Sequence, residues 1–300
     1  MIFGVRFISY HCILGFMFAD ACRIAKGFTR PVATSLRFQD GAISTILNSF
    51  ILVNEDGWAI TAGHTFDSLV KFEGDRKKIA EINQMNSGSS EPAKMDPKFI
   101  LNHSFWWGWD GVMIREVTVD RKIDIALVKL ANIRPNMVPN YPVFADPNDV
   151  SIGSSVCRLG HPFVDPPTEF DVSRSAFRIP KIDSDMSIFA NDGIVSKIVT
   201  VKKAGNSPFD AMYIDISTPG YRGQAGGPIV NAEGKVCGMQ INTIAMPFGF
   251  HFMDSEKNPI EDQFCCIGRA VHVKTIRQFL DSKNISYRSD DSGEEYRIIG

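Results

Sequence analysis

The sequence predicts an all-β protein. Short runs rich in β-branched and aromatic residues recur along the chain, for example over residues 32–38, 43–53 and 155–160, and turn residues separate them. Helical patterns are few, and the clearest covers residues 273–282. With 300 residues, of which 44% are hydrophobic, the chain can bury one large core or two smaller ones.

The charge and the metal-binding residue types exclude several classes of function. The formal net charge is -2 and no long basic run occurs, so we expect no nucleic-acid partner. No spacing of Cys and His is typical of a metal site, and the adjacent Cys265 and Cys266 are a poor ligand pair for zinc. We therefore expect neither a metal nor another cofactor.

The cysteines and the N-terminal residues bear on the compartment. Cys157 and Cys237 lie in apolar, strand-like runs typical of buried thiols, and we expect free cysteines in a reducing, cytoplasmic compartment. Residues 8–19 are largely apolar and residues 19–21 resemble a signal-peptidase site, so export or anchoring through residues 1–21 is the alternative. Polar residues within this run favour a packed N-terminal helix or strand, and we expect no membrane partner.

A glycine-dense loop is the most distinctive stretch. Residues 220–228 read Gly-Tyr-Arg-Gly-Gln-Ala-Gly-Gly-Pro, and Ile-Val follows. Such a loop opens the backbone so that two neighbouring N–H groups point at one spot, which is how a chain builds an oxyanion hole for acyl transfer. The alternative is a tight hairpin turn, because glycine adopts positive φ at little cost.

Two further motifs supply a histidine and a carboxylate. Residues 54–57 form a predicted hairpin turn, and the strand Gly-Trp-Ala-Ile-Thr-Ala-Gly-His that follows ends at His64. Asp124 lies in the hydrophobic run Lys-Ile-Asp-Ile-Ala-Leu-Val-Lys-Leu of residues 122–130. A carboxylate that enters a core needs a partner, and we expect His64 to be that partner. The alternatives are a hydrogen-bonded core histidine and an exposed carboxylate at the start of a strand.

These three motifs resemble those of the trypsin-like serine proteases. Residues 57–64 resemble the Thr-Ala-x-His motif of that family, residues 122–130 its Asp-x-Ala-x-x-x-Leu motif, and residues 220–228 its Gly-x-Ser-Gly-Gly-Pro motif. Their order along the chain is the chymotrypsin order. The Gly-Ile-Val-Ser of residues 193–196 and the C-terminal strand and helix are similar to those of HtrA-type peptidases. The resemblance extends over residues 30–285 and is strongest to bacterial trypsin-like and HtrA-type domains.

The resemblance implies the chymotrypsin-like double barrel: two antiparallel six-stranded β-barrels with the site in the cleft between them, and a C-terminal helix. Its parts would be an N-terminal extension, a first barrel with the His and the Asp, a second barrel with the oxyanion loop, and a C-terminal helix with an acidic tail, over residues 1–29, 30–140, 141–272 and 273–300. Between His64 and Asp124 we expect more barrel strands and a surface excursion, and we expect residues 244–263 to form an extended loop.

The same resemblance assigns the catalytic roles. His64 would be the general base and acid, Asp124 would orient it, and the backbone N–H groups of Gly223 and Ala225 would form the oxyanion hole. The nucleophilic Ser of the family belongs at position 225, where this chain has Ala. A methyl group cannot attack a carbonyl, and loss of the nucleophile lowers turnover about a millionfold. The chain as written is therefore expected to be catalytically inactive.

Two explanations for Ala225 stand open. It is an engineered Ser→Ala change in a serine endopeptidase, or the chain is a natural pseudoprotease that binds peptides or a partner protein. His64, Asp124 and the glycines at 223, 226 and 227 are all retained. Their retention favours an inactivated protease.

The expected ligand is a protein or peptide in extended form. The strand Ile241-Asn242-Thr243 is expected to pair with it by strand addition, beside Pro219 and the first residue of the glycine-dense loop, Gly220. Pro219 stands where digestive trypsins have a pocket Asp, so no preference for Arg or Lys follows. We expect Gln240 and Thr243 to help line a pocket for an uncharged side chain, and a regulatory partner is possible. The oligomeric state is left open.

Overall fold

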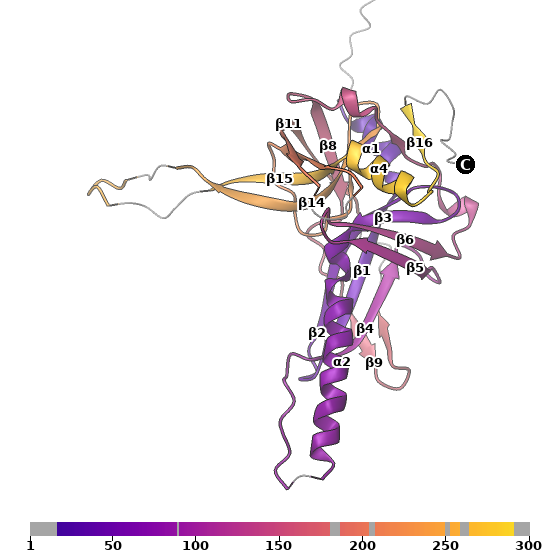
Figure 1. Cartoon of the computed structure of the whole chain (residues 1–300), viewed down its shortest axis with the longest axis vertical. Coiled ribbons are helices and arrows are strands. Elements are labelled where there is room, and N and C mark those ends of the chain that lie inside the picture. The colour runs from indigo at the N-terminus through magenta and orange to yellow at the C-terminus, as the bar shows by residue number, and fades with distance from the viewer. Residues whose placement is uncertain are drawn as a thin grey trace, which may run out of the picture.

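Two large, mainly antiparallel β-sheets, a separate two-stranded sheet and three α-helices form the regular structure of the described residues (Figure 1). The computed structural model describes residues 17–88, 90–180, 187–203, 208–249, 253–258 and 264–290. The predicted all-β double barrel with a C-terminal helix is confirmed. Most of the alternative signal segment over residues 1–21 lies outside the described residues.

The first sheet has six strands in the order β4-β1-β2-β3-β6-β5. It curls around a core in which Phe50, Phe66 and Trp107 pack together, with the Phe50 and Trp107 ring centroids 5.2 Å apart. Its strands are β1 (Thr29–Phe38), β2 (Ile43–Leu52), β3 (Trp58–Ala62), β4 (Ile100–Trp107), β5 (Met113–Asp120) and β6 (Ile125–Ala131).

The second sheet closes into a barrel of six strands. Its order runs β13-β8-β11-β12-β15-β14, and a further pairing of β13 with β14 completes the circle. These strands are β8 (Ser155–Gly160), β11 (Phe189–Val201), β12 (Ala211–Ile216), β13 (Pro228–Val230), β14 (Val236–Pro247) and β15 (Phe264–His272). The short strands β7 (Val143–Phe144) and β16 (Arg288–Ser289) extend the sheet beyond β14, while β9 (Glu169–Asp171) and β10 (Ala176–Arg178) form a separate hairpin.

Three strands of the first sheet are buried on both faces. In β6, Ile125 and Leu127 belong to the core that the second barrel shares, whereas Ala126, Val128 and Leu130 belong to the core of the first sheet. The strands β2 and β3 divide their side chains between the two cores in the same way. Because successive side chains of a strand point to opposite faces, such a strand reads as a continuous hydrophobic run. The run around Asp124 has this origin.

Two helices cover the second barrel. The helix α1 (Ala19–Lys26) buries Ala21 and Ala25 in the shared core. The helix α4 (Val273–Ser282), where the sequence predicts a helix, buries Ile276, Phe279 and Leu280 there. The side chain of His272 caps α4, since its Nδ1 accepts a hydrogen bond from the N–H of Lys274 at 2.9 Å. Within the residues described, no helix is long and apolar enough to cross a membrane.

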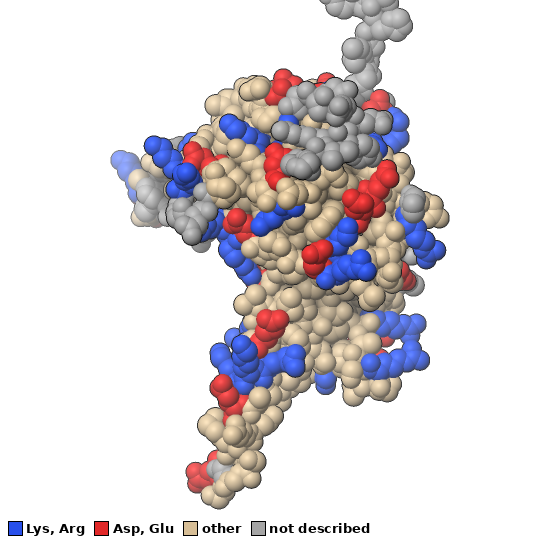
Figure 2. All heavy atoms as spheres, turned by 45° about the vertical axis from the view of Figure 1, so that its right-hand side comes forward, with Lys and Arg blue, Asp and Glu red and all other residues tan. Residues whose placement is uncertain are grey.

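From the sequence we expect only barrel strands and a surface excursion between His64 and Asp124, and this expectation missed a long helix there. The helix α2 (Asp67–Asn86) has 20 residues and projects from the body of the protein (Figure 1). Of its residues only Asp75 is buried, and the Asp75 carboxylate accepts a hydrogen bond from the N–H of Ile100 at 2.9 Å. Basic and acidic side chains are interspersed along it (Figure 2). The apolar residues of α2 are spread around the helix and do not form one stripe, so no amphipathic period predicts it.

A projecting hairpin corrects the expectation of a loop over residues 244–263. Residues 244–247 continue β14 and pair with residues 264–267 of β15, from Ile244 opposite Ile267 to Pro247 opposite Phe264. The two strands extend away from the barrel as a ribbon (Figure 1). Most side chains of this outer part are exposed on both faces, so no buried face imposes the alternating pattern that predicts a strand.

We predict that Phe50→Ala lowers the free energy of unfolding by about 3–5 kcal/mol. Phe50 is fully buried and contacts the rings of Trp107 and Trp109, so truncation leaves a cavity. Urea unfolding followed by tryptophan fluorescence measures the change. The control is Val70→Ala on α2, where the side chain is 58% exposed and the expected change is within about 0.5 kcal/mol. Equal effects of the two substitutions would contradict this account of the core.

Candidate active site

His64 and Asp124 lie together at one end of the doubly buried strands. Residues 62 and 125 are the last pair of the β3–β6 ladder, so the chain segments just beyond them emerge side by side. His64 lies in a turn of 3-10 helix, η1 (Gly63–Phe66), that follows β3. Asp124 immediately precedes β6 with a φ of 54°. The strand pairing therefore brings together two residues that are sixty positions apart.

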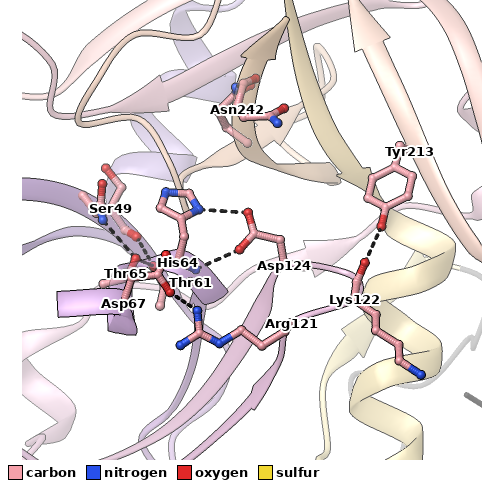
Figure 3. Close-up of polar contacts among 12 residues, drawn as sticks. Ser49, Thr61, His64, Thr65, Asp67, Arg121, Lys122, Asp124, Tyr213 and Asn242 are labelled. Atoms are coloured by element: carbon pink, nitrogen blue, oxygen red, sulfur yellow. Dashed lines mark hydrogen bonds and ion pairs between the residues drawn. The ribbon is translucent and has the colours of Figure 1, made fainter. Parts of the chain in front are cut away.

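Both oxygens of the Asp124 carboxylate bind His64 (Figure 3). Oδ2 lies 2.9 Å from the imidazole Nδ1, and Oδ1 accepts a hydrogen bond from the backbone N–H at 2.8 Å. An ionised carboxylate only accepts, so Nδ1 carries the proton and the lone pair of a neutral imidazole is on Nε2. The His64 side chain is 39% exposed. Its Nε2 makes no hydrogen bond to any described residue, and it is open to a ligand.

The second barrel supports the turn that carries Asp124. The Tyr213 hydroxyl, on β12, donates a hydrogen bond to the backbone oxygen of Lys122 at 3.2 Å (Figure 3). On the other side of the turn, Arg121 forms an ion pair with Asp67 at the start of α2. The position of Asp124 thus depends on contacts with both barrels and with α2.

The glycine-dense loop packs directly against the first sheet. A Cβ atom on Gly226 would lie 2.1 Å from the backbone oxygen of Ser49 and 2.3 Å from Oγ1 of Thr61. A Cβ atom on Gly227 would lie 2.1 Å from the backbone oxygen of Leu159. Gly226 also has a φ of 84°, a region that favours glycine. These glycines are therefore required for packing. Their presence is not by itself evidence that the chain descends from a working protease.

Ala225 lies within this contact. Its backbone oxygen accepts a hydrogen bond from the N–H of Ser49 at 2.8 Å, and the Ser49 hydroxyl donates to the backbone oxygen of Gly223 at 2.8 Å. The N–H groups of Gly223 and Ala225, which the sequence singled out for an oxyanion hole, donate to no described residue. Within the described part of the chain, both N–H groups therefore remain available to a ligand oxygen.

The side-chain amides of Gln224 and Asn191 connect the glycine-dense loop to β11. The buried Gln224 accepts a hydrogen bond from the N–H of Tyr221 at 2.9 Å and donates from Nε2 to Oδ1 of Asn191 at 2.8 Å. Asn191, on β11, donates in turn to the backbone oxygen of Pro219 at 3.1 Å. Sequence reasoning missed Asn191, because nothing in its neighbourhood distinguishes it from an ordinary strand residue.

The residues expected to bind substrate gather on β14 and the loop beside it. Thr243 Oγ1 donates to the backbone oxygen of Gly220 at 2.5 Å, and Gln240 Nε2 donates to the backbone oxygen of Asn242 at 2.6 Å. Pairing with β13 and its flanking residues ends at Gln240, and beyond it that edge of β14 pairs with no described strand. The Ile241 side chain lies in the shared core instead, so only its backbone can meet a ligand.

A buried arginine was also missed. Arg158 of β8 donates from Nε to Oε1 of Gln240 at 2.7 Å and from Nη1 to the backbone oxygen of Pro219 at 2.8 Å. A lone arginine within the apolar run Val-Cys-Arg-Leu was the available signal. Also near the loop, His161 is buried and its Nδ1 lies 3.1 Å from the Ser49 hydroxyl. Burial lowers the pKa of His161 to about 3, so this second histidine of the site is neutral.

The family model of the trypsin-like peptidase domain matches residues 49–239, which is more than half of the chain. The chain belongs to this family. The matched span contains His64, Asp124 and the glycine-dense loop. No curated protein sequence matches the chain. Among solved structures, this trypsin-like peptidase domain is similar to the active form of the Rv3671c protease from M. tuberculosis, with 11% identity and a TM-score of 0.47 over 87% of this chain and 82% of that one.

We predict that Gly226→Ala destabilises this trypsin-like peptidase domain by about 1–3 kcal/mol more than Gly41→Ala. The two glycines have nearly the same φ, 84° and 87°, so the backbone strain of about 1–2 kcal/mol is common to both. Only at Gly226 does the added methyl group meet fixed atoms, since nothing lies within 4 Å of a Cβ on Gly41. Equal shifts in urea unfolding would show that the loop moves away from Ser49 without difficulty.

Proposed function

We propose that this chain has the active-site architecture of a serine endopeptidase that binds extended peptides, with Ala225 in place of the nucleophilic Ser. The observation that carries the proposal is the 2.9 Å contact between His64 Nδ1 and Asp124, with Nε2 exposed and free of described partners. Packing and hydrogen bonding within the fold explain why the chain has Asp124 and the glycines of the loop. They do not explain why the His64 imidazole is oriented by a carboxylate and open to solvent.

With Ser at position 225 the residues would act as follows. Nε2 of His64 takes the hydroxyl proton as the oxygen attacks the carbonyl carbon of the peptide, and Asp124 stabilises the imidazolium that forms. The N–H groups of Gly223 and Ala225 stabilise the oxyanion, and His64 passes its proton to the leaving amine. Water then hydrolyses the acyl-enzyme with His64 again as base. With Ala225 the first step has no nucleophile, and the chain binds peptides without cleaving them.

Two origins of Ala225 fit this proposal. The exposed and oriented His64 supports a working endopeptidase changed by a Ser→Ala substitution. The second candidate is a natural pseudoprotease that binds peptides, and the packing requirement at Gly226 is compatible with it. Because a non-catalytic chain must also keep that glycine, its retention does not distinguish the two. Both origins predict that the peptide lies along the unpaired edge of β14 near Asn242 and Thr243.

Restoring the nucleophile tests the proposal. We expect the Ala225→Ser protein to react with a fluorophosphonate probe and to hydrolyse a peptide mixture, and the unchanged chain to do neither. We expect this activity without N-terminal cleavage. Digestive trypsins are activated when cleavage creates an N-terminal ammonium that pairs with an Asp just before the nucleophile, and here that position is the uncharged Gln224. Mass spectrometry of the labelled protein locates the modified residue.

A second substitution identifies the base. His64→Ala in the Ala225→Ser protein is expected to abolish labelling, while circular dichroism remains unchanged. Persistent labelling would assign the base to another residue. A folded Ala225→Ser protein that never labels would instead favour the binding protein over the inactivated endopeptidase.

We also propose a reducing, cytoplasmic location, with an exported or anchored chain as the alternative. Cys22, Cys157, Cys237, Cys265 and Cys266 are all free thiols, and Cys12 lies outside the described residues. Cys157 and Cys237 are buried, and burial raises the pKa of Cys237 to about 12. Cys265 and Cys266 are exposed on β15.

Thiol titration tests this location. In protein purified from a reducing cytoplasm we expect all six cysteines to react after denaturation. In the native state we expect Cys265 and Cys266 to react rapidly, and Cys237 only on unfolding. The Cys265→Ser, Cys266→Ser double variant is the control and is expected to lose the two rapid thiols. Stable disulfides in the natural protein would support export.

A further inference from the structure

Arg158 lies in the interior of the second barrel and points its guanidinium at the predicted substrate site. The residue is 1% exposed. Besides the bonds to Gln240 and Pro219, its Nη2 donates to the backbone oxygen of Thr218 at 3.3 Å. Its guanidinium also fills the space beside Gly268, where a Cβ atom would lie 2.2 Å from Nη2. The guanidinium therefore contacts Thr218 and Pro219, the two residues just before the glycine-dense loop, from the interior of the barrel.

No carboxylate of the described chain neutralises this cation. Its three hydrogen-bond acceptors are two backbone oxygens and one carboxamide, and the ionisable groups that influence it are Cys157 and Tyr221. The neighbouring Arg269 on β15 differs in this respect. Its Nε and Nη2 bind the two oxygens of Asp215 at 2.7 and 3.0 Å. One arginine of the barrel is paired with an acid, and the other is not.

A buried guanidinium without an anion is electrostatically unfavourable. Burial lowers the pKa of Arg158 to about 10, which reflects the loss of its hydration. Neutral acceptors satisfy some of its N–H groups but leave its charge uncompensated. An approaching carboxylate gains a charge-assisted hydrogen bond in a water-poor environment, where such a bond is roughly twice as strong as a neutral one.

Gln240 connects the guanidinium to the substrate strand. Its Oε1 accepts from Arg158 and its Nε2 donates to the backbone oxygen of Asn242, at the edge of β14. The carboxamide also lies against the loop, since a Cβ atom on Gly220 would be 2.2 Å from Nε2. A glutamate carboxylate has nearly the size and shape of this carboxamide. The Gln240 side chain therefore occupies the position that a ligand carboxylate would take.

We propose that the site along the unpaired edge of β14 selects peptides that present a carboxylate beside Gly220, and that the carboxylate displaces the Gln240 carboxamide and pairs with Arg158. The group is either an Asp or Glu side chain or the C-terminal carboxylate of the peptide. This inference rests on the proposed function and names its ligand class. It replaces the expectation, drawn from Gln240 and Thr243 alone, of a pocket for an uncharged side chain.

Ala225 allows binding to be measured without turnover. The probes are fluorescent hexapeptides, acetylated and amidated, that carry Glu, Gln, Asp, Asn, Leu or Lys at each position in turn, and fluorescence anisotropy gives the affinities. We expect one position at which Glu or Asp binds at least about tenfold tighter than Gln or Asn. A second set compares free-acid with amidated C-termini. A preference in the first set assigns the carboxylate to a side chain, and a preference in the second assigns it to the C-terminus.

Arg158 variants test the assignment. Arg158→Gln is expected to reduce the preference for an acid to less than about twofold, and Arg158→Lys to retain part of it. The control Arg269→Gln removes the paired arginine and is expected to destabilise the barrel without changing the acid-to-amide ratio. If Arg158→Gln fails to fold, Gln240→Ala provides a second test. It removes the competing carboxamide and is expected to tighten the binding of acidic peptides only.

Each other result has a definite meaning. Equal affinity for acidic and amide peptides overturns the role of Arg158 and leaves peptide binding intact. A preference that survives in folded Arg158→Gln assigns the recognition to another cation and likewise overturns the proposal. No binding of any peptide overturns the proposed function together with this inference.

Discussion

The close approach of the glycine-dense loop to the first sheet is the contact on which the site depends. Gly226 lies against the Ser49 backbone and the Thr61 hydroxyl with no room for a side chain, and the Ser49 N–H binds the backbone oxygen of Ala225. The Thr61 hydroxyl in turn binds the backbone oxygen of Ser49 at 2.7 Å. One barrel thereby fixes the loop of the other. Any larger residue at position 226 would separate the loop from the strand that leads to His64.

The histidine and the aspartate owe their pairing to strands that are buried on both faces. The β3–β6 ladder places its side chains alternately in two cores, so a register shift of one residue would exchange the two sets. Register is therefore strongly determined where the two segments leave the sheet. His64 and Asp124 follow at that end. The register of β3 and β6 therefore determines the relative position of the two residues, whose side chains are 2.9 Å apart.

Polar groups buried in the second barrel determine the local charge beside the glycine-dense loop. Gln224 and Asn191 hold the loop with neutral amides, whereas Arg158 brings a positive charge that no described carboxylate balances. Buried polar groups are normally hydrogen-bonded, and here the backbone oxygens that Arg158 and Asn191 bind are those of Thr218 and Pro219, just before the loop. Because its hydrogen-bond partners are neutral, the positive charge of Arg158 has no counterion among the described residues. The charge of the whole chain, -2, gives no hint of this local field.

The sequence by itself determined the all-β class, the C-terminal helix and the three motifs, because each is a local pattern of hydrophobicity, turns or glycine. It also pointed to the partnership of His64 and Asp124, since a carboxylate beside a buried strand needs a partner. Tertiary structure alone decided the rest. The helix α2 and the outer part of the β14–β15 hairpin bury too little surface to leave a periodic signal. The burial of Arg158 among neutral acceptors depends on strands distant in sequence, and no local pattern encodes which charges meet across a barrel.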